Sequence, residues 1–165
     1  MSNYRASHIA NFFLDKSKQD SIPVTQMKLM KLVYIGYGWV YAVLDKKLFD
    51  EPILAWQHGP VIRSLYDEFK HFGSREINKP AVEFDFDNAE LTTPKISDDD
   101  SQIQLVLEKV WDVYKRFSAS SLRQKTHEAG TPWSTTYDSG VPDLIIDNDK
   151  IRNHFTRKIT EYLNA

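Results

Sequence analysis

The sequence lacks cysteine entirely, and it has no marked excess of either charge. Without cysteine the chain can form neither a disulfide nor a thiolate metal site, and the composition fits a reducing compartment. Its 21 Lys and Arg residues nearly balance 23 Asp and Glu residues, which gives a net charge of −2. This balance provides no general attraction to nucleic acid or to anionic lipid, so we expect neither as the main partner.

Long apolar runs are also missing. The longest uncharged stretch, residues 32–44, is far shorter than the roughly 20 residues that a transmembrane helix needs. The first residues, MSNYRASHIANFF, do not have the layout of a signal peptide. We therefore expect a soluble, cytoplasmic protein that does not associate with a membrane.

The common signatures of catalysis are absent as well. The sequence has no Gly-x-Ser-x-Gly elbow and no glycine-rich phosphate loop, and its five histidines do not have zinc-protease spacing. His127 is the only histidine next to an acid, Glu128. This pair leaves one alternative open, a small hydrolase or metal-dependent enzyme that uses both residues. The main prediction is a non-catalytic protein without cofactor or metal.

What the chain does contain is apolar and aromatic residues, at 41% and 13% of the total. This content argues against disorder, and the length suits one domain over residues 1–165. Helical periodicity predicts a helix from Thr25, its N-cap, to Leu44 that is apolar on all sides and therefore central. Gly36 and Gly38 within it indicate the close approach of another backbone.

The remaining elements follow from shorter patterns. Helices are predicted over residues 4–16, 60–72, 97–117, 119–128 and from Asp147 onward. Pro60 suits the first position of the second of these, and Gly73 would end it. Residues 53–57 and 81–92 are predicted to be strands, and in the second of these Val82, Phe84 and Phe86 share one face. The helical spacing after Asp147 places Tyr162 on the core face of the last helix. The predicted fold is mainly α: a single compact helical domain around the central helix, with a small β-hairpin or two- to three-stranded sheet at one edge.

Aromatic and polar residues on loops and helix starts form the candidate functional surface, because binding residues tend to lie on such segments and aromatic and arginine side chains dominate binding hot spots. The candidates, hereafter the predicted surface residues, are Trp56, His58, Arg63, His127, Glu128, Trp133 and Tyr137.

An ordered set of motifs spans most of the chain. Its residues are Lys28-Leu29, Lys31-Leu32-Val33-Tyr34, Gly38-Trp39, Leu48-Phe49, Ala55-Trp56, Gly59-Pro60-Val61, Tyr66, Leu122, Thr126-His127-Glu128 and Pro132-Trp133. In this order they resemble the Panacea domain family, the SocA-like antitoxins of bacteria and phages.

The resemblance implies an antitoxin that neutralises a cognate protein toxin by direct binding. It implies that the toxin is encoded by the adjacent gene, and that a cellular protease or chaperone is a second partner if the protein acts as a proteolytic adaptor. A DNA-binding autorepressor is a further alternative, against which the balanced charge counts. The oligomeric state, including a homo-oligomer, stays open.

Overall fold

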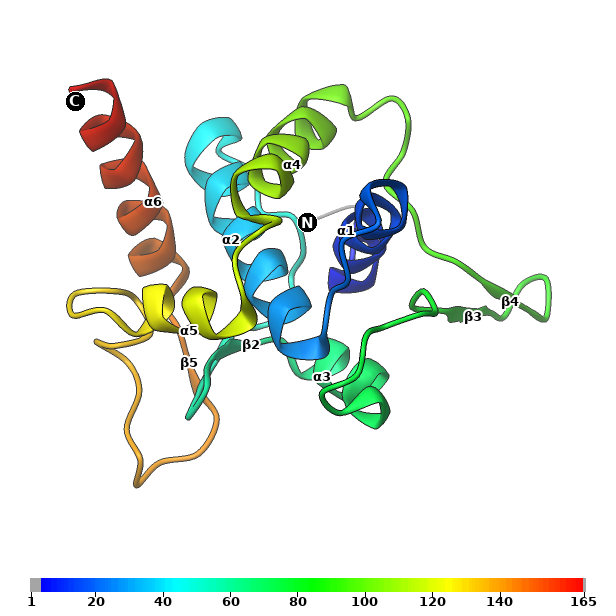
Figure 1. Cartoon of the computed structure of the whole chain (residues 1–165), viewed down its shortest axis with the longest axis horizontal. Helices are drawn as coiled ribbons and strands as arrows, with labels where there is room; N and C mark the ends of the chain where they lie inside the picture. Colours follow the sequence, from blue (N-terminus) through cyan, green and yellow to red (C-terminus); the bar gives the residue numbers. More distant parts are fainter. Residues whose placement is uncertain (1–3, 165) are drawn as a thin grey trace.

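Helix α2, Gln26–Leu44, runs through the middle of the computed structural model, which describes residues 4–164 (Figure 1). The hydroxyl of Thr25 accepts the N–H of Lys28, so the predicted N-cap is confirmed. Helices α1, α3, α4, α5 and α6 all contact α2. The prediction of a mainly α fold around a buried central helix is therefore confirmed.

The surrounding helices are α1 (Ala6–Asp20), α3 (Arg63–Phe69), α4 (Ser101–Tyr114), α5 (Ala119–His127) and α6 (Asn148–Leu163), and a short 3-10 helix, η1 (Lys70–Phe72), follows α3. The side chains of Ser118 and Asp147 cap α5 and α6, at the predicted starts. Helix α1 extends past its predicted end, and α4 begins four residues after the predicted Ser97. Gly73 follows η1 with φ of 58°, as predicted for a helix stop. Among residues 4–164, no helix combines the length and apolar character needed to cross a membrane.

The two glycines of α2 face side chains of neighbouring helices. A Cβ atom on Gly36 would lie 2.8 Å from Leu107 of α4, and one on Gly38 would lie 2.1 Å from Phe155 of α6. The predicted approach of another backbone was thus wrong. The two glycines leave room for the side chains of Leu107 and Phe155, which pack α4 and α6 against α2.

A three-stranded antiparallel sheet with the order β2-β1-β5 lies beside these helices. Its strands are β1 (Leu54–Trp56), β2 (Gly59–Val61) and β5 (Leu144–Ile145). Pro60 lies in β2 rather than in a helix, so its predicted helical position was wrong. The reason is that β2 is an edge strand, where proline's missing N–H is tolerated.

The predicted strand over residues 81–92 is instead a separate hairpin of β3 (Glu83–Asp85) and β4 (Glu90–Thr92), which projects from the helical body in Figure 1. The Asp85 carboxylate accepts the backbone N–H groups of Asp87 and Asn88 and thereby forms the turn. The predicted apolar face is not buried, since Phe86 is 86% exposed.

Helix α6 departs from its prediction near its end. Ile151 and Phe155 are buried as predicted, but Tyr162 is 82% exposed. In Figure 1 the last turns of α6 extend away from the other helices, so the periodic pattern continues beyond the surface against which the helix packs.

Candidate functional site

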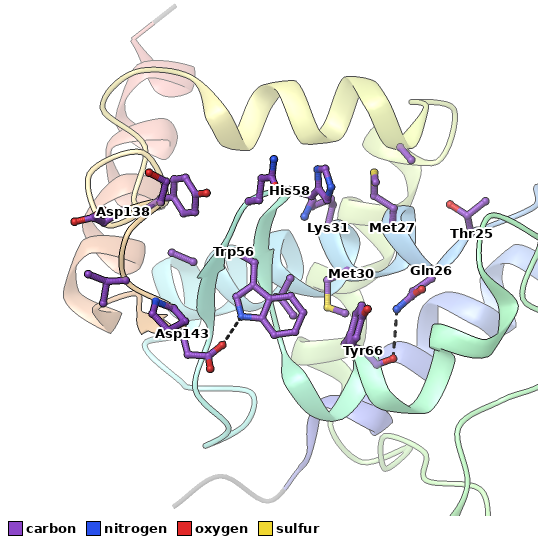
Figure 2. Close-up of a pocket in the computed structure, with 18 of the residues that line it drawn as sticks. Thr25, Gln26, Met27, Met30, Lys31, Trp56, His58, Tyr66, Asp138 and Asp143 are labelled. Atoms are coloured by element: carbon purple, nitrogen blue, oxygen red, sulfur yellow. Dashed lines mark hydrogen bonds between the residues drawn. The ribbon is translucent and has the colours of Figure 1, made fainter.

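A groove of about 920 Å³ lies between the first turns of α2, the β1–β2 turn, α3 and the loop over residues 137–143 (Figure 2). The larger and charged side chains on its lining include those of Met27, Met30, Lys31, Trp56, His58, Tyr66, Tyr137, Asp138 and Asp143. Figure 2 shows Thr25 at one end, Asp138 and Asp143 at the other, and Lys31 between them. The lining is predominantly apolar, with a few polar groups, as in many binding sites.

Trp56 contacts residues from two other segments that form the same side of the groove. Its indole Nε1 donates to the Asp143 carboxylate at 2.8 Å, and the Arg63 guanidinium pairs with the same oxygen at 2.8 Å. Arg63 also lies over the Trp56 ring, 5.2 Å from its centroid, while the Tyr66 ring packs edge-on at 5.0 Å. These contacts connect the end of β1, the start of α3 and the 137–143 loop.

Trp133 fixes the opposite side of the β1–β2 turn. Its Nε1 donates to the carbonyl oxygen of Trp56 at 2.6 Å, and its ring lies 3.7 Å from the His127 ring and 4.8 Å from the stacked Tyr137 ring. His127 Nε2 is 3.1 Å from the carbonyl oxygen of Gln57. Helix α5 and the segment that follows it therefore pack against the β1–β2 turn and hydrogen-bond to its backbone.

The seven predicted surface residues divide into two groups. Trp56, His58 and Tyr137 line the groove itself. Arg63, His127, Glu128 and Trp133 do not line it. Trp133 is buried and its polar atom is bonded to the backbone, so it supports the groove wall instead.

His127 and Glu128 are not arranged as an open catalytic pair. His127 Nδ1 is 2.7 Å from the carbonyl oxygen of Arg123, so both ring nitrogens face backbone carbonyls. Glu128 is the C-cap residue that follows α5, and its backbone carbonyl accepts from the N–H and hydroxyl of Thr131. Within residues 4–164, no cluster of three or more His, Cys, Asp or Glu side chains is placed to hold a metal ion.

Lys31 is the unusual residue of the groove, because it is a lysine that is only 1% exposed. Its Nζ donates to the carbonyl oxygen of Pro60 at 3.3 Å and would lie 2.7 Å from a Cβ atom on Gly59. Gly59 also has φ of +115°, a conformation that side chains rarely allow. Glycine at this position therefore permits both the tight turn and the lysine beneath it.

Burial, together with a smaller effect of the nearby Arg123 guanidinium, lowers the pKa of Lys31 from its usual value near 10.5 to about 7. In the unfolded chain the amine keeps its ordinary pKa. At pH values between the folded pKa and the unfolded pKa of Lys31, the unfolded state therefore binds more protons than the folded state. The free energy of unfolding rises with pH over this range.

This linkage predicts the behaviour of Lys31→Met. Between pH 7 and pH 8.5 the unfolding free energy of the wild type should rise by about 1.5 kcal/mol relative to the variant, at about 1.4 kcal/mol per pK unit. Urea unfolding of both proteins at the two pH values measures this difference, in which the other titrating groups cancel. A difference that does not change with pH would show that Lys31 titrates as an exposed lysine.

Sequence reasoning missed Met27, Met30, Lys31 and Tyr66 as site residues. The predicted helix from Thr25 to Leu44, apolar on all sides, placed both methionines in the core, yet Met27 is partly exposed and both line the groove. The available signal was Lys31 itself, one of two lysines in a helix whose other residues are almost all apolar. The loop over residues 138–143 carried no signal, because its position depends on distant Trp56 and Arg63.

Comparison with known proteins identifies one family. The model of the family "Antitoxin SocA-like, Panacea domain" matches residues 29–134. The chain is also 30% identical over 131 residues to Antitoxin SocA of Caulobacter vibrioides (strain NA1000 / CB15N), an alignment that covers 78% of this chain and 68% of the relative. No solved structure matches. The matched range includes α2 from Leu29 onward, the β1–β2 turn and Trp133, and it ends before the 137–143 loop.

Proposed function

Since the chain belongs to the SocA-like, Panacea-domain antitoxin family, we propose that it neutralises a cognate protein toxin by binding it directly. In this proposal residues 1–165 act as one domain in the cytoplasm, without catalysis of their own, and the toxin is the product of an adjacent gene. Handing the toxin to a protease or chaperone would be an additional step after binding.

The observation that supports direct binding most strongly is the groove. It is a preformed, largely apolar depression flanked by Trp56, Tyr66 and Tyr137, and aromatic side chains of this kind carry much of the energy of protein interfaces. Methionines on one wall add side chains that adapt to the shape of a partner. We propose that the predicted surface residues belong to this interface, with Trp56, His58 and Tyr137 in contact with the toxin and Arg63, His127, Glu128 and Trp133 supporting or bordering them.

Co-expression tests the proposal. Cells that produce the neighbouring gene product alone should stop growing, and simultaneous production of this protein should restore growth. A tagged form of this protein should then copurify with that product in a stable complex. A neighbouring product that is harmless, or growth that is not restored although both proteins accumulate, would overturn the proposal.

A further inference from the structure

Lys31, a buried lysine that lines the groove, and Arg123, a half-buried residue near it, both lack an acidic partner in the part of the chain that the structure describes. Lys31 has a carbonyl oxygen as its hydrogen-bond partner, although an ammonium has three donors. The Nε of nearby Arg123 on α5 is buried and makes no hydrogen bond within the described part of the chain. Across residues 4–164, neither cation forms an ion pair with an acid.

The acids that line the groove are already engaged. Asp143 accepts from Trp56 and pairs with Arg63, and the Asp138 carboxylate accepts the N–H of Gly140. Besides Lys31 and these two acids, the titratable side chains on the described lining are His58, Tyr66 and Tyr137, so the lining has no further Asp or Glu. The groove therefore has a buried amine without an acidic partner in the middle of a largely apolar surface.

Burial of a cation without a counter-charge is costly, and the lowered pKa of Lys31 expresses that cost. A carboxylate brought to this position by a partner would remove it, because a desolvated ion pair is stabilised by the low polarity of its surroundings. Lys31 lines the groove but is only 1% exposed, so its ammonium has to move out from beside the β1–β2 turn to meet such a group, a movement that the flexible four-carbon stem of lysine allows.

The position of Lys31 in the groove indicates whether the partner's carboxylate is a side chain or a chain terminus. Figure 2 shows Lys31 midway between the Thr25 end of the groove and the Asp138–Asp143 end, with Met27 and Met30 nearby. A bound segment that fills the groove extends to both sides of Lys31. The carboxylate is therefore an acidic side chain within the segment rather than a chain terminus.

Resting on the proposed function, we propose that the groove binds a segment of the toxin that is apolar except for one Asp or Glu, whose carboxylate forms an ion pair with Lys31. The apolar side chains of the segment pack against Met27, Met30 and Trp56. The toxin is thus recognised by a single acid in an apolar context.

Proton uptake on binding tests the ion pair. At pH 8 an amine with a pKa of about 7 is mostly neutral, and pairing with a carboxylate restores its proton. Calorimetric titration of the wild type with the purified neighbouring gene product, in two buffers of different ionisation enthalpy, should show uptake of about 0.9 proton per complex. Lys31→Met should show no uptake and bind at least ~30-fold more weakly.

Lys28→Met is the matched control, since Lys28 is also a buried lysine of α2 but donates to the backbone carbonyl of Lys115, away from the groove. It should keep the affinity and the proton uptake of the wild type. Among Asp→Asn and Glu→Gln variants of the partner, one should match the loss seen with Lys31→Met and add nothing to it in combination.

The outcomes separate the two proposals. No binding to the wild type overturns toxin neutralisation together with the ion pair. Tight binding without proton uptake, or with equal affinity for Lys31→Met, overturns the ion pair alone and leaves neutralisation standing. Self-association of the wild type that Lys31→Met abolishes, without a change in affinity for the neighbouring product, would assign the groove to a second copy and overturn the ion pair as well.

Discussion

Val40→Asp is expected to remove folded protein from the soluble fraction. Val40 lies in α2 and is fully buried, with helices on several sides of it. An unpaired charge at such a position costs several kcal/mol, comparable with the whole stability of a domain, roughly 5–15 kcal/mol. The yield of soluble protein and its thermal unfolding, followed by circular dichroism, provide the measurement.

Val43→Asp is the matched control, because it makes the same substitution one turn further along the same helix, where Val43 is 51% exposed. Its unfolding free energy should stay within about 0.5 kcal/mol of the wild type. A folded Val40→Asp protein with an unchanged melting temperature would show that α2 is not the centre of the fold.

The second large effect is expected in binding. Trp56→Ala should weaken the complex with the neighbouring gene product by roughly 30- to 1,000-fold, the equivalent of ~2–4 kcal/mol for an aromatic anchor. The substitution removes the ring that packs against Tyr66 and Arg63, as well as the donor that holds Asp143. Growth rescue by the variant should be lost while its circular dichroism spectrum stays that of a folded protein.

Tyr162→Ala controls for the loss of an aromatic side chain in general. Tyr162 is highly exposed on the last turns of α6 and does not line the groove. Its removal should leave both affinity and rescue intact. Equal affinities for Trp56→Ala and Tyr162→Ala would exclude the groove wall as the binding surface.

Much of the fold was predictable because local signals and tertiary packing agreed. Thr25 and Asp147 cap helices whose apolar faces are buried, so propensity, capping and periodicity gave one answer. Pro60 was misassigned because proline suits both a first helical turn and an edge strand, and strand pairing with β1 decided between them. The hairpin was mistaken for one strand because Asp85 forms a turn that alternation alone does not reveal.

The site was predictable only in part, for a different reason. Trp56, His58 and Tyr137 were identified by residue type and by their place on turns. Lys31 lies 25 residues before Trp56 in the sequence, and its role depends on a β1–β2 turn packed over it. A single sequence gives no means of placing such distant segments against each other.

Hydrogen–deuterium exchange of this protein, alone and in complex with the neighbouring gene product, tests the central claim most directly. Direct binding at the groove predicts slower exchange in the complex at the β1–β2 turn, at residues 73–74 and in the 137–143 loop, with no change in the β3–β4 hairpin. Protection confined to the hairpin or to the end of α6, with the groove segments unchanged, would contradict it.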